Sequence, residues 1–229
     1  MRKTDFHNFK EINYFHQNII RELSDKIKRK KDLNILEIGV GNGKLNSFIY
    51  QTFKPKENIC MDYSKDCLKC LKFANKKIIC DLDKTFDFDV KEIKDNSLDI
   101  VIILDVLEHL RWPEHTLKLL HRKLKKKGLV VASTPNINWY NYRLSFLIGN
   151  DVEHFHNTNH VRYWNLRSFR KLFSKNFMIL RQLTDFKICK PFSYFLGKER
   201  FLSVKLKYNS KVFGDNQVII CKKNKDVWN

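Results

Sequence analysis

The stretch Ile35–Gly43, with the sequence ILEIGVGNG, decides the fold of this chain. An apolar run at 33–38 passes directly into three glycines that are spaced two residues apart. The run predicts a buried strand, and the glycines allow a tight turn in which backbone N–H groups approach a ligand. The dinucleotide fingerprint G-x-G-x-x-G would need a glycine at position 44, where Lys44 stands. The stretch therefore predicts a ligand-binding strand–turn–helix unit and argues against a nicotinamide dinucleotide.

Apolar and amphipathic segments alternate along the rest of the chain. Strands that alternate with helices imply crossover connections and a mostly parallel sheet that is covered on both faces. The chain is therefore predicted to have an α/β fold. The predicted strands are 33–38, 58–61, 76–80, 98–104, 129–133, 177–183 and 218–221, and the predicted helices are 44–52, 64–75, 113–126 and 166–174.

The N-terminal segment has a helical pattern of its own. Apolar residues recur every three or four positions from Phe9 to Ile27, and a basic run follows at 28–31. This periodicity predicts an amphipathic helix. A length of 229 residues fits one ordinary domain with additions. We therefore expect an N-terminal helix at 1–31 and one domain at 32–229, with an insertion at about 136–163.

The chain is strongly basic, with a formal net charge of +19. Residues 161–229 carry 16 Lys and Arg against 4 Asp and Glu, a net charge of +12. Such a field favours an anionic partner, such as a nucleic acid, a phosphorylated sugar, a nucleotide or an acidic lipid surface. A solvated basic surface without a partner is the alternative.

Two further features restrict the setting of the protein. No stretch reaches the roughly 18 to 20 apolar residues that a membrane span needs, and the first residues contain no apolar region of a signal peptide. We therefore expect a soluble cytoplasmic protein whose six cysteines are reduced thiols. Cys67 and Cys70 form a single C-x-x-C pair, which fits ordinary helix residues better than a zinc or redox site.

Acidic residues follow three of the predicted strands at the points where the strands end. Asp62, Asp81 and Asp105 come directly after the second, third and fourth predicted strands. In an open α/β sheet, ligands bind at the carboxyl ends of the strands. Acids at successive strand ends are therefore expected to accept hydrogen bonds from a polar ligand.

These features resemble a known family. The pattern E-x-G-x-G-x-G within Ile35–Gly43 is similar to motif I of the class I S-adenosylmethionine-dependent methyltransferases. Segment 98–110, with D-V-L-E-H at Asp105–His109, resembles the "FD…EVLEH" segment of the family, and 160–166 resembles its "H-x-R-F/Y-F/W" stretch. The resemblance runs from about residue 33 to residue 184 and points to the ubiquinone and polysaccharide-cluster types.

The resemblance implies a Rossmann-like, doubly wound, mostly parallel seven-stranded sheet with helices on both faces. It also implies S-adenosylmethionine as the cofactor. Asp62 would hold the ribose hydroxyls and Asp81 the adenine amino group, and the ring of Tyr63 would pack on the adenine face. The cofactor-binding residues that the resemblance implies are Glu37, Gly39, Gly41, Gly43, Asp62, Tyr63, Asp81, Leu82 and Leu104.

Methyl transfer needs a nucleophile in line with the methyl group and, for a hydroxyl acceptor, a base that removes the proton. His109 is the first candidate base, since it lies one turn after the fourth strand, beside the expected position of the methyl group. Tyr163 and His160 are the next candidates. A buried histidine that only holds the start of a helix is the alternative for His109.

A metal site is a second hypothesis for the same region, although the leading prediction is a site without a metal. Asp105, Glu108, His109 and His160 form a set of oxygen and nitrogen ligands that suits Mg or Mn. The pattern resembles two metal-assisted groups of the family: the ubiquinone-pathway O-methyltransferases, and the enzymes that methylate the 3′-terminal 2′-hydroxyl of small RNAs. It also occurs in members that use no metal.

The insertion is expected to cover the acceptor, by analogy with the family. It holds His154, His156 and His160, and an aromatic segment at 139–147 that fits either a lid or a core helix. The resemblance favours a small molecule or an anionic glycan sugar as the acceptor. An RNA methyltransferase, with metal-assisted 2′-O-methylation as one form, is the runner-up. A non-catalytic cofactor-binding scaffold is the third hypothesis, and the oligomeric state stays open.

Overall fold

The computed structural model describes residues 14–27, 31–84, 90–149, 159–185, 187–189, 201–203 and 214–224. The helices are α1 (Tyr14–Lys26), α2 (Lys44–Phe53), α3 (Lys65–Lys69), the 3₁₀ helix η1 (Leu107–His109), α4 (Pro113–Lys123), α5 (Tyr140–Leu147) and α7 (Leu166–Ser174). The strands are β1 (Asn34–Ile38), β2 (Glu57–Asp62), β3 (Lys76–Ile79), β4 (Leu98–Leu104), β5 (Leu124–Pro135), β6 (Phe177–Thr184), β7 (Lys187–Cys189), β8 (Phe201–Ser203) and β9 (Asn216–Lys223). None of the described helices combines the length and the apolar character that crossing a membrane would take.

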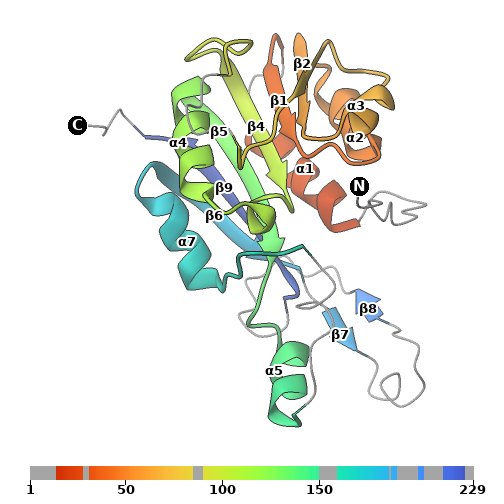
Figure 1. Cartoon of the computed structure of the whole chain (residues 1–229), viewed down its shortest axis with the longest axis vertical. Coiled ribbons are helices and arrows are strands. Elements are labelled where there is room, and N and C mark those ends of the chain that lie inside the picture. Colours follow the sequence, from red (N-terminus) through yellow and green to blue (C-terminus); the bar gives the residue numbers. More distant parts are fainter. Residues whose placement is uncertain are drawn as a thin grey trace.

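Seven strands form one sheet in the order β3-β2-β1-β4-β5-β9-β6 (Figure 1). β1 pairs in parallel with β2 and β4, β2 pairs with β3, and β4 pairs with β5. β9 lies antiparallel between β5 and β6. The predicted Rossmann-like, mostly parallel sheet of seven strands is therefore confirmed. β7 and β8 pair in a separate two-stranded sheet, which the sequence pattern did not predict.

Helices cover both faces of the sheet. Successive side chains of a strand point to opposite faces, so a strand between two helix layers contributes to two cores. Ile100 and Ile102 of β4 pack in one core with α1 and α2, whereas Val101 and Ile103 pack in another core with α4 and α7. A strand that is apolar on both sides is what a parallel sheet between two helix layers requires. Burying one such side chain contributes roughly 1.5–3 kcal/mol.

α1 shares a core with the sheet. Its residues Ile19, Ile20 and Leu23 are buried in the cluster that also contains Ile35 of β1 and Val131 of β5. Spacings of three and four residues place these side chains on one side of the helix. The predicted boundary after residue 31 stays a prediction, but the residues on its two sides pack together.

Two helices end earlier than predicted. α3 ends at Lys69 rather than at residue 75, and the chain then turns so that the Asn75 side chain accepts a hydrogen bond from the Asn58 backbone N–H at 2.8 Å. α4 ends at Lys123 rather than at residue 126, because β5 already begins at Leu124. The start of β5 thus sets the end of α4.

Gly128 lies inside β5 rather than after a helix. A Cβ at this position would meet the side chain of Leu124 at 2.8 Å and the carbonyl oxygen of Leu98 at 3.2 Å. The glycine therefore permits a close approach of β5 to the start of β4, where the register of pairing shifts. A glycine that follows an amphipathic segment is typical of a helix end and also of a tight strand contact.

The two ends of the predicted insertion lie side by side and are joined by hydrogen bonds. Asn136 forms a bridge with Trp164, and the Ile137 backbone N–H donates to the Trp164 carbonyl at 3.1 Å. α5 projects beyond these joined ends, away from the sheet (Figure 1), and its Leu144 and Leu147 are 51% and 80% exposed. α5 is thus no core helix of the sheet, and the lid interpretation stays a prediction. The predicted candidates His154 and His156 lie outside the described residues.

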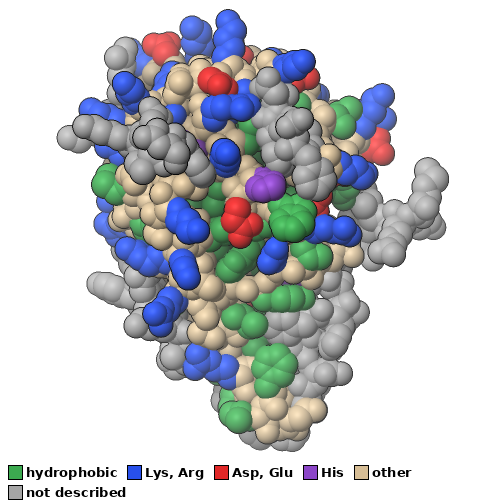
Figure 2. All heavy atoms as spheres, turned by 60° about the vertical axis from the view of Figure 1, so that its left-hand side comes forward, with side chains coloured by type: hydrophobic (Ala, Val, Ile, Leu, Met, Phe, Trp, Pro, Cys, Tyr) green, Lys and Arg blue, Asp and Glu red, His purple; other side chains and the backbone are tan. Residues whose placement is uncertain are grey.

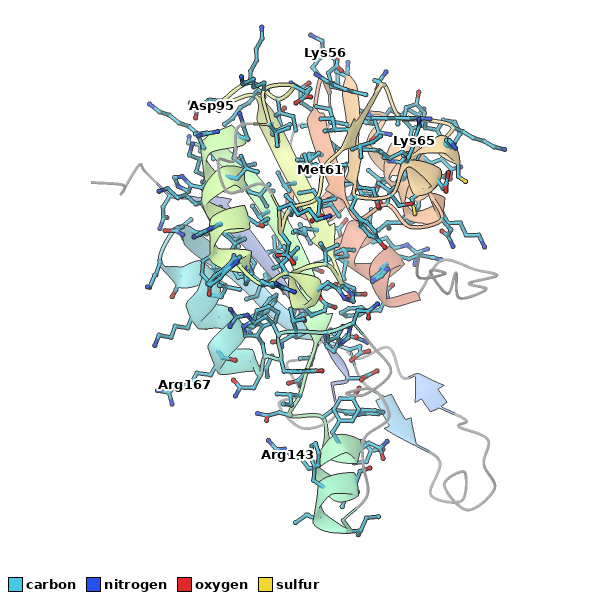
Figure 3. The ribbon with its side chains drawn as sticks, in the orientation of Figure 1. Lys56, Met61, Lys65, Asp95, Arg143 and Arg167 are labelled. Carbon is cyan, nitrogen blue, oxygen red and sulfur yellow. The ribbon has the colours of Figure 1, made fainter. Side chains whose placement is uncertain are left out.

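Figure 3 distinguishes the edge of the sheet where the parallel strands begin from the edge where they end. Lys56 precedes β2 and Asp95 precedes β4, and both lie at one outer edge of the molecule. Met61, the second-last residue of β2, lies farther inside. The parallel strands therefore run away from that edge, and their carboxyl ends meet on the opposite side, where a ligand site is expected.

Candidate functional site

The glycine loop joins the end of β1 to the start of α2. Gly39, Gly41 and Gly43 all have left-handed backbone conformations, with φ angles of 77°, 50° and 76°. A Cβ at Gly39 would lie 2.3 Å from a methyl group of Val106, and a Cβ at Gly43 would lie 2.7 Å from Leu71. These two positions therefore require glycine for both conformation and packing.

Gly41 differs from the other two glycines in its surroundings. A Cβ at this position would have no neighbouring atom within 4 Å, so the space beside it is open. Any side chain here would be strained by the left-handed backbone and would also enter that space. Gly41 is exposed, so its backbone N–H can be approached by the predicted cofactor.

Asp62, at the end of β2, is held against the glycine loop. One carboxylate oxygen accepts a hydrogen bond from the Val40 backbone N–H at 2.9 Å, and the other accepts one from the Ser64 N–H at 2.8 Å. A carboxylate can accept about four hydrogen bonds, so acceptor positions remain for two ligand hydroxyls. The side chain is oriented by its backbone partners and fits the predicted ribose-binding role.

Glu37 is buried beneath the loop. Its side chain is 1% exposed, and Oε2 accepts a hydrogen bond from the Asn46 side chain of α2 at 2.7 Å. Burial raises the pKa of Glu37 to about 8, although the hydrogen bond from Asn46 acts in the opposite direction. Glu37 therefore supports the helix that follows the loop, and its predicted contact with the cofactor stays a prediction.

The predicted adenine-binding residues follow β2 and β3. Asp81 accepts a hydrogen bond from the backbone N–H two residues further on, at 3.1 Å, and its other oxygen pairs with Lys84 at 3.0 Å. The Lys84 side chain is 85% exposed, so this ion pair is weak. Leu82 is buried, whereas Tyr63 is 66% exposed beside Asp62. An exposed aromatic ring next to Asp62, the predicted ribose-binding acid, fits packing on an adenine face.

Asp105 follows Leu104, the buried last residue of β4, and has a left-handed backbone with φ of 53°. Its Oδ1 accepts a hydrogen bond from the Ser133 hydroxyl at 2.5 Å, and its Oδ2 accepts one from Nε2 of His16 at 2.8 Å. The Ser133 hydroxyl accepts in turn from the Asp105 backbone N–H at 3.1 Å. Residues of α1, β4 and β5 thus meet at one carboxylate.

Opposing effects act on the charge of Asp105. Burial disfavours ionisation, but the hydrogen bonds and charge of His16 and the Ser133 hydroxyl outweigh it, so the pKa of Asp105 lies below its ordinary value. Aspartate tolerates a left-handed backbone better than most residues do, yet the conformation is uncommon and gathers at functional sites. Asp105 therefore combines an ionised carboxylate with an unusual backbone at the edge where ligands bind.

Glu108, His109 and His160 form a second polar group just after Asp105. Each offers one potential ligand atom, and these three atoms lie within 4.8 Å of one another. The two histidine rings are 4.7 Å apart between centroids, and Nε2 of His160 lies 4.0 Å from Oε1 of Glu108. The structure thus brings together three of the four residues of the metal hypothesis. The carboxylate of the fourth, Asp105, is engaged by Ser133 and His16 instead.

The end of the insertion orients this second group. The Glu108 carbonyl accepts hydrogen bonds from the backbone N–H groups of Val161 and Arg162, at 2.8 and 3.1 Å. The Asn159 carbonyl lies 3.2 Å from Nδ1 of His109. Because a carbonyl can only accept, Nδ1 of His109 is the donor and its Nε2 keeps a lone pair. The predicted base is therefore held in one tautomer by a neutral partner.

Tyr163 extends the group toward the surface. It is 39% exposed, and its hydroxyl donates to the His160 carbonyl at 3.2 Å. The centroids of the Tyr163 and His160 rings are 6.2 Å apart. The three predicted catalytic residues, His109, His160 and Tyr163, are thus neighbours in the fold.

The carboxyl group of Glu108 differs from that of Asp105. Glu108 is 1% exposed, and this burial, together with the nearby charge of Asp105, raises the pKa of Glu108 well above its ordinary value. A raised pKa keeps the carboxyl group neutral over a wider range of pH. The site thus contains one acid that tends to be charged and one that tends to be neutral.

Besides Ser133, the sequence pattern missed His16 as a residue of this site. It stands 89 positions before Asp105, and no recognised motif includes it. The available signal is its place on α1, four residues before Ile20 and seven before Leu23, on the buried side of the helix. A polar residue in an apolar stripe indicates a contact with another polar group, but it does not identify the partner.

Comparisons with known proteins identify a matching family. A family model described as a methyltransferase domain matches residues 9–177, a range that includes His16. An uncharacterized protein of Methanocaldococcus jannaschii is 28% identical over 192 residues, which cover 82% of this chain and 78% of that protein. A ubiquinone biosynthesis O-methyltransferase of Pelagibacter ubique is 27% identical over 135 residues, which cover 57% of this chain and 55% of that protein.

A solved structure has the same fold. The crystal structure of an S-adenosylmethionine-dependent methyltransferase from Archaeoglobus fulgidus has a TM-score of 0.64 to this chain. The match covers 94% of this chain and 96% of that chain, at 20% sequence identity. At such an identity the likeness concerns the fold alone.

Proposed function

The chain belongs to the class I S-adenosylmethionine-dependent methyltransferases, and from this premise we propose that it methylates a hydroxyl or amino group of a small molecule or a glycan sugar. One observation carries the proposal. Gly41, Asp62 and Asp105 follow strands β1, β2 and β4, whose carboxyl ends meet at one edge of the sheet. His16 contacts Asp105 there, and Glu108, His109 and His160 form a group just after it.

The described residues fit the cofactor at this edge. When bound, S-adenosylmethionine supplies an electrophilic methyl group on a sulfonium. The loop around Gly41 would approach it with backbone N–H groups, and Asp62 would accept hydrogen bonds from the ribose hydroxyls. Asp81 and Tyr63 would hold the adenine. Together these residues would orient the methyl group toward the acceptor, which is the main requirement for rapid transfer.

We assign His109, His160 and Tyr163 to the acceptor side. They are neighbours directly after the end of β4, and the Asn159 carbonyl leaves Nε2 of His109 able to accept a hydrogen bond from an acceptor hydroxyl. α5 and the rest of the insertion would cover the bound acceptor and exclude water. This arrangement would place the nucleophilic atom without a covalent step on the protein.

We propose that the acceptor side works without a metal ion. With Asp105 engaged by His16 and Ser133, the group that remains offers one carboxyl and two imidazoles, whereas Mg and Mn prefer sets rich in oxygen. Full activity in excess chelator is the expected result. Loss of activity in chelator and its recovery with Mg or Mn would contradict this part of the proposal.

The charge of the chain favours an anionic acceptor of small size. On the face shown in Figure 2, lysine and arginine side chains are scattered over the surface, and hydrophobic side chains gather around and below the histidine near its centre. A nucleic acid needs a continuous basic stripe or groove that follows its backbone, whereas a small anionic sugar needs only a few nearby charges. The dispersed pattern on this face favours the small acceptor over RNA.

Tritium in the methyl group of S-adenosylmethionine tests the proposal. The purified chain is incubated with the labelled cofactor and with separate fractions of an enzyme-inactivated extract from the source organism: small molecules, glycans and RNA. We expect label in the small-molecule or glycan fraction. Label in RNA alone, with binding that weakens steeply with salt, would instead support RNA methylation. Binding of S-adenosylhomocysteine without transfer to any fraction would support the scaffold hypothesis.

The role of Asp62 can be tested without an acceptor. Asp62→Ala should weaken binding of S-adenosylhomocysteine roughly ten- to a hundredfold in calorimetry, because hydrogen bonds to a charged group contribute about 1.5–3 kcal/mol. Asp62→Asn, which keeps the shape of the side chain, separates this loss from disorder of the loop. Asp66→Ala, at an exposed acid of α3, is the matched control. Unchanged affinity in both Asp62 variants would refute the assignment.

A further inference from the structure

Transfer of a methyl group to a hydroxyl requires removal of the hydroxyl proton. A histidine that takes this proton becomes positively charged, so an ionised carboxylate in contact with its ring stabilises the charged product. The same carboxylate fixes the tautomer, because it can only accept a hydrogen bond. The partners of each histidine at the end of β4 therefore decide which of them is suited to act as the base.

His16 has the partner that a base needs. Its Nε2 lies 2.8 Å from Oδ2 of Asp105, whose other oxygen is held by the Ser133 hydroxyl. Nε2 must carry a hydrogen, so in the neutral ring Nδ1 keeps its lone pair. In the part of the chain that the structure describes, the His16 ring has no second hydrogen-bond partner, and its side chain is 18% exposed. Nδ1 is thus available to an acceptor.

His109 has different partners. Its Nδ1 faces the neutral carbonyl of Asn159, and within the described ranges no carboxylate oxygen lies within 4.0 Å of its ring nitrogens. The ring of His160 is beside it, at 4.7 Å between centroids. Within the described ranges, a positive charge on His109 would therefore have no carboxylate in hydrogen-bond contact with the ring, and any charge on His160 would oppose it. These contacts suit hydrogen bonding to an acceptor better than removal of its proton.

Asp105, the partner of His16, lies beside the loop that is proposed to hold the cofactor. Val106, the next residue, packs against Gly39, where an added Cβ would lie 2.3 Å from its methyl group. The segment that carries Asp105 therefore lies against the loop that is proposed to hold the cofactor. α1 brings His16 to the same place from the far end of the sequence, and its Ile20 and Leu23 anchor the helix in the core.

We infer that His16, held by Asp105 and Ser133, accepts the proton of a hydroxyl acceptor, whereas His109 and His160 bind that acceptor. This inference rests on the proposed function. The acceptor oxygen gives its proton to Nδ1 of His16 and forms a bond to the methyl carbon. The carbon–sulfur bond breaks, and its electron pair remains on sulfur. The products are the methyl ether, S-adenosylhomocysteine and a protonated His16, which then releases its proton to water.

Chemical rescue tests the role of His16. The assay uses tritiated S-adenosylmethionine and the extract fraction that accepts label from the natural chain. His16→Ala should lower the transfer rate about 100-fold or more, since general base catalysis contributes roughly 10²- to 10⁴-fold. Added imidazole should restore part of the rate, and affinity for S-adenosylhomocysteine should stay within about twofold. His115→Ala, at an exposed histidine of α4, is the control and should keep its activity.

A second measurement does not depend on activity. Nitrogen NMR of the neutral form of the His16 ring in the natural chain should show the hydrogen on Nε2, and Asp105→Asn should change that tautomer balance. Hydrogen on Nδ1 in the natural chain would overturn the inference. If His16→Ala does not fold, His16→Gln replaces it in the rescue assay.

The possible failures are distinguishable. Transfer by the natural chain with no loss in His16→Ala would overturn the role of His16 and leave the proposed function intact. Loss of transfer without imidazole rescue, together with weaker binding of S-adenosylhomocysteine, would show a structural role and also overturn the inference. Absence of transfer by the natural chain to every fraction would overturn the proposed function and this role with it.

Discussion

The two polar groups at the end of β4 contain the same kinds of residue and differ in charge. In one, His16 and Ser133 surround Asp105, whose pKa lies below its ordinary value. In the other, His109 and His160 lie near Glu108, whose pKa lies well above it. The difference comes from burial and hydrogen bonding. The Asp105 side chain is 34% exposed and accepts two short side-chain hydrogen bonds, whereas Glu108 is 1% exposed. Donors and solvent access thus decide which acid stays ionised.

The largest expected effect is at the ionised acid. Asp105→Asn should lower the rate of methyl transfer about 100-fold, because asparagine tolerates the left-handed backbone but supplies no charge to stabilise a protonated His16. Affinity for S-adenosylhomocysteine should change less than about threefold. The tritium assay at saturating cofactor and calorimetry measure the two quantities.

Replacing Glu108, the acid with the raised pKa, by its amide is the control for Asp105→Asn. Glu108→Gln should lower the transfer rate less than about fivefold, because glutamine resembles the protonated carboxyl group that burial favours. A larger loss in Glu108→Gln than in Asp105→Asn would reverse the roles of the two groups. It would also revive the metal hypothesis if Mg or Mn restored the natural chain after chelation.

The two histidines should differ in the kinetic constant that they affect. His109→Ala should raise the KM for the acceptor about tenfold, as expected for loss of one hydrogen bond worth about 1.5 kcal/mol, with kcat within about threefold. His16→Ala should instead lower kcat. Initial rates across acceptor concentrations separate the two constants. A fall in kcat for His109→Ala that imidazole restores would mean that His109, as the sequence indicated, is the base.

The sequence predicts contacts between residues that stand close together along the chain better than contacts between distant ones, and the two groups differ in this respect. Asp105, Glu108 and His109 stand within five residues of one another in a recognisable segment, so their proximity could be predicted. His160 could be added because its own motif resembles a family stretch. His16 could not, since it lies 89 positions from its partner and joins it only when α1 packs on the sheet. A residue whose role depends on tertiary packing leaves little trace in local spacing.

The pattern of strands predicts the fold correctly, but the bounds of a few helices and strands differ from the prediction. The apolar run at 98–104 gave β4 with its correct bounds, because a strand buried on both faces needs an unbroken run. Residues 124–127 were assigned to a helix and the turn after it, yet they form the start of β5. Three successive lysines there carry no strand signal, and the pairing of Leu124 with Leu98 decides the conformation. Contacts between strands outweigh weak local preference.

The smallest expected effects concern stability and have opposite dependence on pH. Asp105 has a lowered pKa in the folded chain, so its charge stabilises the fold above the unfolded pKa of 3.8, and this contribution is lost as the pH falls through the folded value. Glu108 has a raised pKa, so the fold is favoured most below the unfolded pKa of 4.5 and loses stability as the pH rises through the folded value.

Urea unfolding of three chains between pH 4 and pH 8, in chelator, measures this contrast. Asp105→Asn should be less stable than the natural chain at pH 7, by about 1 kcal/mol after allowance for solvent screening, and the difference should stay nearly constant down to about pH 4, because it is lost only below the unfolded pKa of 3.8. Glu108→Gln should match the natural chain near pH 4 and gain on it by about 1 kcal/mol or more as the pH rises. Difference curves with the same slope would mean that the two acids share one charge state, and the assignment of the base to His16 would lose its electrostatic reason.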